Sequence, residues 1–145
     1  MTDKKTSATL HFDQVALGQT LPELTIDVST GLIVATALAS RDYQDVHHDR
    51  DLAKQKGSQD IFMNILTTNG LVGRFITDWT GPSGQLKRVN IRLGVPNYAG
   101  DTMVLTGRVS AKKDDGLIEV EVLGTNSLGA HVTGTVSVVL PCGSF

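Results

Sequence analysis

Cysteine is almost absent from the sequence: Cys142 is the only one in 145 residues. A single thiol excludes an internal disulfide and a cysteine-based zinc site. Long apolar runs are absent too, since none approaches the roughly 20 residues that a membrane-spanning helix needs. The polar, charged segment from Met1 to Thr9 lacks the apolar stretch of a secretory signal. We therefore expect a cytoplasmic protein without internal disulfides.

An excess of either charge is also missing. The 13 Lys and Arg residues stand against 15 Asp and Glu residues, so the formal net charge is −2 and no basic field favours nucleic acid. With 40% hydrophobic residues, a chain of 145 can bury one core. We expect one folded domain over residues 21–145, preceded by a polar lead over residues 1–20.

Apolar patterning predicts six strands. Residues 21–28 form a plausible first strand, and the nearly continuous apolar run 32–39 has the β-branched content of a buried one. Ser40, a residue type that often caps helices, ends that run. Four more strands with turn signals between them are predicted, over residues 86–93, 102–111, 117–123 and 131–140.

Two helices are predicted between these strands. Leu52 to Lys56 is a short one that ends at Gly57. The second runs from Asp60 to Trp79, is interrupted at Asn69-Gly70, and carries apolar residues on more than one side. The fold class is therefore α+β, with a long central helix wrapped by a curled antiparallel sheet.

A crowded polar segment, residues 41–57, lies between the predicted buried strand and the long helix. It places Asp42 and His47 five positions apart, where an irregular turn can aim both side chains at one point. A carboxylate and an imidazole that share one water can act as a base and then return the proton. Such a pair also occurs by chance in many proteins, but its position between two apolar elements favours a catalytic role.

The same segment carries a family motif. Residues 42–49, Asp-Tyr-Gln-Asp-Val-His-His-Asp, resemble the Asp-x-(Asn/Gln)-x-aliphatic-His-x-Asp signature of R-specific, MaoC-like enoyl-CoA hydratases. Gly100-Asp101-Thr102 is similar to a later motif of that family, and the resemblance covers roughly residues 30–140. It implies a single hot-dog domain and hydration of a 2-enoyl-CoA to the 3-hydroxyacyl-CoA, with Asp42 and His47 as catalytic residues. It implies no cofactor, because coenzyme A is part of the substrate.

Residues 39–79 resemble one subgroup more closely, the small subunits of actinobacterial hydratases that act on CoA thioesters of shortened steroid side chains. This resemblance implies a bulky, steroid-derived acyl group. In the subgroup, a second hot-dog chain with a DUF35-type domain supplies the rest of the pocket. Because a lone sheet also leaves an unpaired edge, we expect a homodimer or a heteromer with a second MaoC-like chain.

The resemblance also implies roles for residues around the pair. Where the general family has a His-Gly pair, this chain has Asn64-Ile65, and backbone N–H groups of these residues would stabilise the thioester oxyanion at the amino end of the long helix. Gln44 stands with Asp45 where the family has Asn-Pro. Gln44 and Asp49 are expected to fix His47 and its loop.

Basic residues of the predicted strand 86–93 could bind coenzyme A at the rim of a pocket. These are Lys87, Arg88 and Arg92, with Arg74 of the long helix as a further candidate. The alternative, ordinary solvated charges, is about equally well supported, and no glycine-rich phosphate loop is present.

Histidines outside the pair carry weaker predictions. No metal site is predicted at His47, His48 and Asp49, because neighbouring residues point apart and a fourth ligand is missing. His131 is expected on a strand surface and His11 in the tail. Two alternatives to a hydratase remain open: a hot-dog acyl-CoA thioesterase, and a non-catalytic subunit that shapes a partner's pocket.

Overall fold

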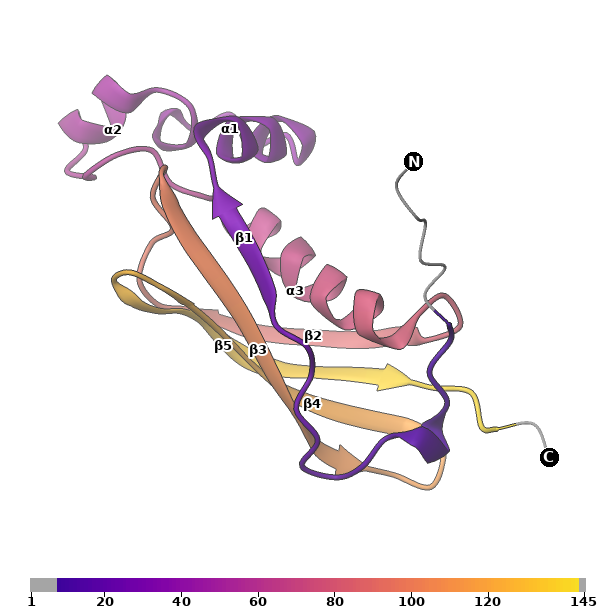
Figure 1. Cartoon of the computed structure of the whole chain (residues 1–145). Coiled ribbons are helices and arrows are strands. Elements are labelled where there is room, and N and C mark those ends of the chain that lie inside the picture. Colours follow the sequence, from indigo (N-terminus) through magenta and orange to yellow (C-terminus); the bar gives the residue numbers. More distant parts are fainter. Residues whose placement is uncertain (1–7, 144–145) are drawn as a thin grey trace, which may run out of the picture.

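Five antiparallel strands in the order β1-β3-β4-β5-β2 form one curved sheet in the computed structural model, which describes residues 8–143 (Figure 1). Residues 1–7, which belong to the predicted polar lead, lie outside the described residues, as do 144–145. The strands are β1 (Leu24–Val28), β2 (Gln85–Leu93), β3 (Asp101–Lys112), β4 (Leu117–Asn126) and β5 (Gly129–Val139). The helices are α1 (Thr30–Ala39), α2 (Arg50–Gln55) and α3 (Ile65–Thr80), with short 3-10 turns η1 (Phe12–Gln14) and η2 (Asp45–His47).

Helix α3 lies along the concave face of the sheet (Figure 1). Its buried residues recur on one side of the helix, at Thr67, Thr68, Val72, Phe75, Ile76 and Thr80. Opposite Phe75, strand β3 has Gly107, where an added Cβ would lie 2.9 Å from the Phe75 ring. One long helix held by a curled antiparallel sheet is the hot-dog fold, and the predicted α+β class is confirmed.

The predictions for the last three strands and their hairpins are confirmed. Strands β3 and β4 are joined by a turn that ends at Gly116, whose φ of 84° is a conformation that glycine adopts without strain. Strands β4 and β5 are joined at Asn126 and Gly129. No helix within residues 8–143 is long and apolar enough to cross a membrane.

The prediction of a buried strand over residues 32–39 is wrong, because this segment is helix α1. Ser29 caps it by accepting a hydrogen bond from the Leu32 N–H at 3.0 Å. Only Ile33 and Ala37 are buried, four residues apart as on one face of a helix. A short apolar run has the same pattern in a buried strand and a buried helix, and Ser40 follows as the C-terminal cap.

The predicted start of the long helix at Asp60 is also wrong, by five residues. Asn64 is the N-terminal cap of α3, and its side chain accepts a hydrogen bond from the Thr67 N–H at 3.0 Å. Residues 60–63 are not helical, and Phe62 pairs instead with Tyr98 in an isolated bridge. The helix continues through Asn69-Gly70, where the predicted interruption does not occur.

Residues of the lead that lie within the structure pack against the domain. Val15 is buried in the core, and Leu10 and Phe12 are partly buried against it. The Lys112 ammonium donates hydrogen bonds to the carbonyl oxygens of Phe12 and Val15, and it lies 4.3 Å from the centre of the Phe12 ring. These contacts hold the segment across the end of β3.

Candidate active site

Asp42 is placed by the end of helix α1. The Arg41 N–H bonds to the Leu38 carbonyl, and the Asp42 N–H bonds to the Ala37 carbonyl at 2.9 Å, which is the Schellman pattern of a helix C-terminus. This pattern requires a left-handed residue, here Arg41 with φ 57°. The helix end therefore fixes the direction in which the Asp42 backbone leaves α1.

The left-handed conformation of Arg41 predicts a stability difference between two substitutions. We expect Arg41→Gly to be more stable than Arg41→Ala by about 1 kcal/mol. At this φ the Cβ of alanine clashes with the backbone, whereas glycine has no Cβ. Both variants remove the guanidinium, so their comparison isolates the backbone. Chemical denaturation measures the difference, and equal stability of the two variants would contradict the assignment of strain to this position.

His47 is held by the carbonyl of Phe62. The side chain is 7% exposed, its Nδ1 lies 2.6 Å from the Phe62 oxygen, and its ring meets the Phe62 ring edge-on. A carbonyl oxygen only accepts, so Nδ1 carries a hydrogen and Nε2 of the neutral ring is left as an acceptor. That Nε2 faces Asp42 Oδ2 at 3.3 Å. A carboxylate and an imidazole nitrogen that face each other in this way can share the hydrogens of one water.

Asn64 links the Asp42 carboxylate to both neighbouring helices. Its Nδ2 donates to Asp42 Oδ2 at 3.1 Å and to Ser40 Oγ at 2.9 Å, while its Oδ1 accepts from the N–H and hydroxyl of Thr67. The side chain is 2% exposed, so its orientation is fixed by burial as well as by hydrogen bonds. All donor and acceptor positions of the amide are used, and the amide holds Asp42 toward His47.

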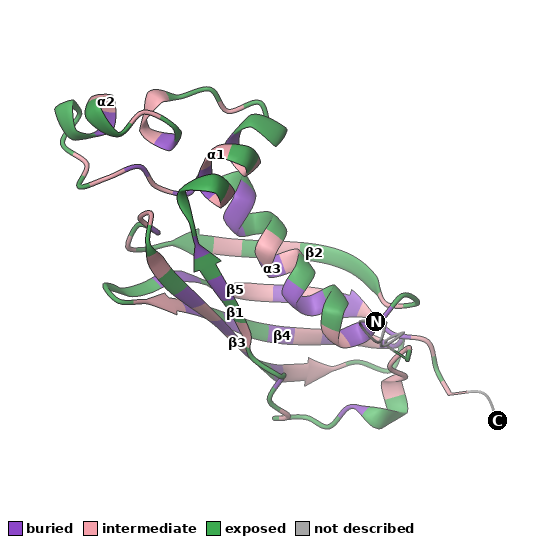
Figure 2. Cartoon of the chain, turned by 45° about the horizontal axis from the view of Figure 1, so that its top comes forward, coloured by how far each residue is buried: buried purple, intermediate pink, exposed green. Residues whose placement is uncertain are grey.

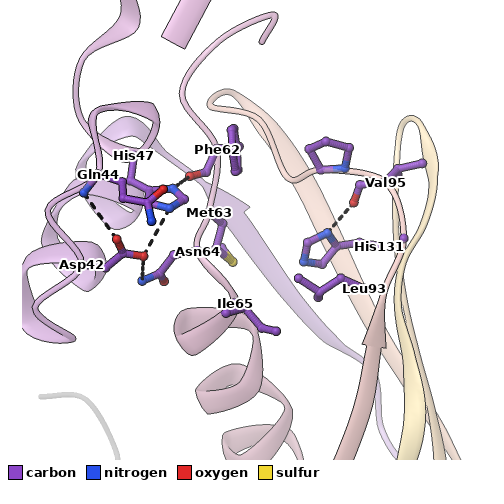
Figure 3. A pocket seen from close by; sticks show the side chains of 12 residues that line it. Asp42, Gln44, His47, Phe62, Met63, Asn64, Ile65, Leu93, Val95 and His131 are labelled. Atoms are coloured by element: carbon purple, nitrogen blue, oxygen red, sulfur yellow. Dashed lines mark hydrogen bonds and ion pairs between the residues drawn. The ribbon is translucent and has the colours of Figure 1, made fainter. Parts of the chain in front are cut away.

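These residues border a cavity of about 350 Å³ (Figure 3). Asp42 and His47 lie on one side, and the segment from Leu93 to Pro96 lies on the other with His131. Ile65 stands at the amino end of α3 beside the cavity. The N–H groups of Ile65 and Leu66 begin the helix, where no carbonyl of the preceding turn can accept from them, and the helix dipole favours negative charge there.

The two residues predicted to fix the His47 loop act through different contacts. The Gln44 N–H lies 3.4 Å from Asp42 Oδ1, its carbonyl accepts from the His47 N–H, and its side chain lines the cavity. Asp49 caps α2 by accepting from the Leu52 N–H at 3.0 Å. Asp49 therefore shapes the loop through α2, whereas Gln44 contacts both members of the pair.

The basic residues predicted at a coenzyme A rim lie on exposed positions of β2 and α3. Lys87, Arg88 and Arg92 are exposed, and they are not among the residues that line the cavity. Arg92 directly precedes Leu93, which does line it. Arg74 forms an ion pair with Asp78 on α3 at 3.3 Å.

His131 was expected on a strand surface, and this is wrong: the residue is 2% exposed and lines the cavity. The reason is an irregular register between β4 and β5. Gly124 pairs with Val132 and Thr125 pairs with Ala130, so His131 is an additional residue between them. A bulge of this kind redirects side chains that simple alternation would place outside. Strand alternation gives no signal for it.

The chain resembles hydratases of known identity. A protein of Mycobacterium tuberculosis, the 3-oxo-4,17-pregnadiene-20-carboxyl-CoA hydratase beta subunit, is 58% identical over 120 residues, which are 83% of this chain and 92% of that protein. The crystal structure of the ChsH1-ChsH2 complex from Mycobacterium tuberculosis contains a chain 55% identical to this one, with a TM-score of 0.84. The match covers 86% of this chain and 98% of that chain.

A more distant structure shows the same fold. The R-hydratase PhaJ1 from Pseudomonas aeruginosa has a TM-score of 0.86 at 19% identity, over 93% of this chain and 88% of that one. No family model matches the sequence. The sequence identity to the mycobacterial subunit extends over most of both proteins. The two solved structures also share the hot-dog architecture described above. On these grounds the chain belongs to the family of that hydratase beta subunit, within the MaoC-like hot-dog hydratases.

Proposed function

We propose that this chain is a catalytic subunit that adds water to a 2-enoyl-CoA with a steroid-derived acyl group. The observation that carries the proposal is the pair formed by Asp42 Oδ2 and His47 Nε2, 3.3 Å apart at the border of a cavity. The fixed Nδ1–H of His47 leaves Nε2 directed at the carboxylate. The amino end of α3 beside the same cavity supplies the site for the thioester oxygen.

The proposed reaction uses one water that lies in the cavity and is hydrogen-bonded to both Asp42 and His47. The pair takes a proton from the water while its oxygen forms a bond to the β-carbon of the enoyl thioester. The carbon–carbon π electrons move toward the carbonyl, and negative charge develops on the thioester oxygen. The pair then returns a proton to the α-carbon, so the thioester gains one water in total and the protein ends unchanged.

The N–H groups of Ile65 and Leu66 are the proposed donors to the developing oxyanion. They are the first two of α3, and a donor in this role is worth roughly 3–4 kcal/mol of transition-state stabilisation. The Asn64 N–H, which the sequence also suggested as a donor, stays a prediction, while the Asn64 side chain is engaged with Asp42 and Thr67. Asn64 is therefore proposed to orient the base, with Ile65 nearest to the oxyanion.

A steroid-derived acyl group is supported by the related beta subunit, whose name specifies 3-oxo-4,17-pregnadiene-20-carboxyl-CoA. In that compound the carboxyl carbon is attached at C20, so C20 is the α-carbon and the ring carbon C17 is the β-carbon that receives oxygen. We propose that such rings contact apolar residues that line the cavity, namely Phe62, Met63, Ile65, Leu93, Val95 and Pro96. Coenzyme A enters as part of this substrate, and the β2 residues Lys87, Arg88 and Arg92 remain candidates for its phosphates.

We further propose that a second MaoC-like chain, of the kind that carries a DUF35-type domain, completes the pocket. Strand β2 is an edge of the sheet over nine residues, and much of it is exposed (Figure 2). Leu86 and Leu93 on this strand are 40% and 37% exposed. Ile65 and Leu66 at the start of α3 are also more than half exposed. An unpaired edge next to exposed apolar groups supports pairing with another chain there. A relative of known structure is part of a two-component complex.

Product analysis tests this function. The protein, alone and co-expressed with a second MaoC-like chain from the same genome, is incubated with 3-oxo-4,17-pregnadiene-20-carboxyl-CoA and the thioesters are separated by liquid chromatography with mass detection. We expect a product heavier by one water, and native mass determination of the same samples reports whether the active form is a heteromer. Release of free coenzyme A would instead support a thioesterase. Unchanged activity of the assembly after Asp42→Asn would make this chain a pocket-shaping subunit.

A further inference from the structure

His131 occupies the side of the cavity opposite the catalytic pair (Figure 3). It is the additional residue of the bulge between β4 and β5, and its side chain is almost completely buried. Its Nδ1 lies 2.6 Å from the Val95 carbonyl oxygen, and its Nε2 lies 2.8 Å from the Thr68 hydroxyl. The proposed reaction assigns no role to this buried imidazole.

The two hydrogen bonds define the state of the ring. Because the Val95 carbonyl only accepts, Nδ1 carries the hydrogen, and Nε2 accepts from the Thr68 hydroxyl. Burial lowers the pKa of His131 below its ordinary value, although the bond to Val95 opposes this shift. A neutral ring with both nitrogens engaged has no proton to exchange with a substrate. His131 is thus placed to hold its neighbours rather than to react.

The neighbours of His131 belong to two borders of the cavity. Thr68 lies in the first turn of α3, and its N–H bonds to the carbonyl of the cap residue Asn64 at 3.3 Å. Val95 lies in the apolar segment from Leu93 to Pro96. Backbone bonds attach Gly94 and Val95 to β5, at His131 and Ala130, but they leave the Val95 carbonyl to the imidazole. One ring therefore joins the helix end to the opposite wall.

We propose that His131 and Thr68 form a positioning pair that fixes the distance between the amino end of α3 and the apolar wall at Val95. The inference rests on the proposed function, in which α3 binds the thioester oxygen and the wall contacts the acyl group. Loss of the Thr68 hydroxyl leaves His131 Nε2 without its donor and lets the wall shift relative to the helix. A misplacement of about 1 Å in such a site is enough to reduce turnover by up to 100-fold.

The test compares three threonine variants in the assembly with the partner chain. Thr68→Val removes the hydroxyl at similar volume, and Thr68→Ser keeps it. Thr80→Val is the matched control, since Thr80 is a fully buried residue of the same helix whose hydroxyl bonds only to the Gly81 carbonyl among the described residues. Twelve residues separate the two threonines, or roughly 18 Å along the helix, so Thr80 is remote from the cavity.

We expect Thr68→Val to lower kcat/KM for 3-oxo-4,17-pregnadiene-20-carboxyl-CoA by about tenfold, with Thr68→Ser and Thr80→Val within about twofold of wild type. Calorimetry uses 3-oxo-4-pregnene-20-carboxyl-CoA, which lacks the side-chain double bond. Of the three variants, only Thr68→Val should bind this probe more weakly than wild type. Binding of free coenzyme A should be the same in all variants, because the pair shapes the acyl side. Thermal denaturation of Thr68→Val and Thr80→Val measures how much stability each variant loses when a buried hydroxyl is removed.

Equal kinetics and equal probe binding in Thr68→Val and Thr80→Val would overturn the positioning role and leave a structural one. Failure of Thr68→Ser to restore kcat/KM would also overturn it, because the hydroxyl is the proposed agent. If wild type binds the saturated probe but does not hydrate the enoyl substrate, the proposed function fails and the binding series alone decides the role of the pair. If wild type neither hydrates nor binds, both proposals fail.

Discussion

We expect Asp42→Asn to lower kcat for hydration by roughly 10²- to 10⁴-fold, the range that a positioned acid or base supplies. The amide has the shape of the carboxylate but cannot take the proton of a water that it shares with His47 Nε2. His47→Ala should have a loss of similar size, since the two groups act on the same water. Steady-state assays with one enoyl-CoA substrate measure kcat for both single variants. The kcat of the double variant should be little lower than that of either single variant.

Two neighbouring residues give matched controls for this experiment. Asp45→Asn removes one negative charge three residues away, from a carboxylate whose pKa is lowered by its hydrogen bond to Lys56 and which lies outside the residues that border the cavity. His48→Ala removes an exposed imidazole next to His47. We expect both controls to keep wild-type kcat. If Asp42→Asn and His47→Ala also turned over near the wild-type rate with intact folding, the assignment of the pair would be wrong.

Short-range patterns predicted the strands and hairpins of this chain. Alternation along β3, β4 and β5 reports which side of a strand is buried, and the Asp115-Gly116 turn has a local conformational reason. Helix α1 was missed because an apolar run of eight residues carries the same signal in either structure. Its actual determinant, the Ser29 hydroxyl bonded to the Leu32 N–H, lies just outside that run.

In the candidate site too, a local motif could be predicted from the sequence, whereas contacts between distant residues could not. Asp42 and His47 are close in sequence, so a local motif could indicate that they meet. Asn64 reaches Asp42 from 22 residues away, and His131 reaches Val95 from 36 residues away. Both depend on how α1, α3 and β5 pack, and a β-bulge that turns His131 inward has no counterpart in the period of the strand. The sequence indicated the two groups that we propose to react, whereas the residues that hold them could be identified only from the structure.

Asn64 gives the second large expected effect, because it both caps α3 and orients Asp42. We expect Asn64→Ala to lose about 1 kcal/mol of stability with the cap. It should also lower kcat by roughly 10- to 100-fold, since a hydrogen bond to a charged group is worth about 1.5–3 kcal/mol. Asn64→Ser separates the two roles: a serine hydroxyl can cap through the Thr67 N–H, but it lacks the amide that bridges Ser40 and Asp42.

The Ser variant should therefore recover the stability that Asn64→Ala loses while it keeps the fall in kcat. Denaturation and steady-state hydration, measured on the same preparations, give both quantities. Recovery of kcat together with stability would show that Asn64 acts only as a cap, and Asp42 would then owe its orientation to His47 and the end of α1. A fall in kcat without a change in stability places the amide in control of the carboxylate, because the helix that carries it is then intact.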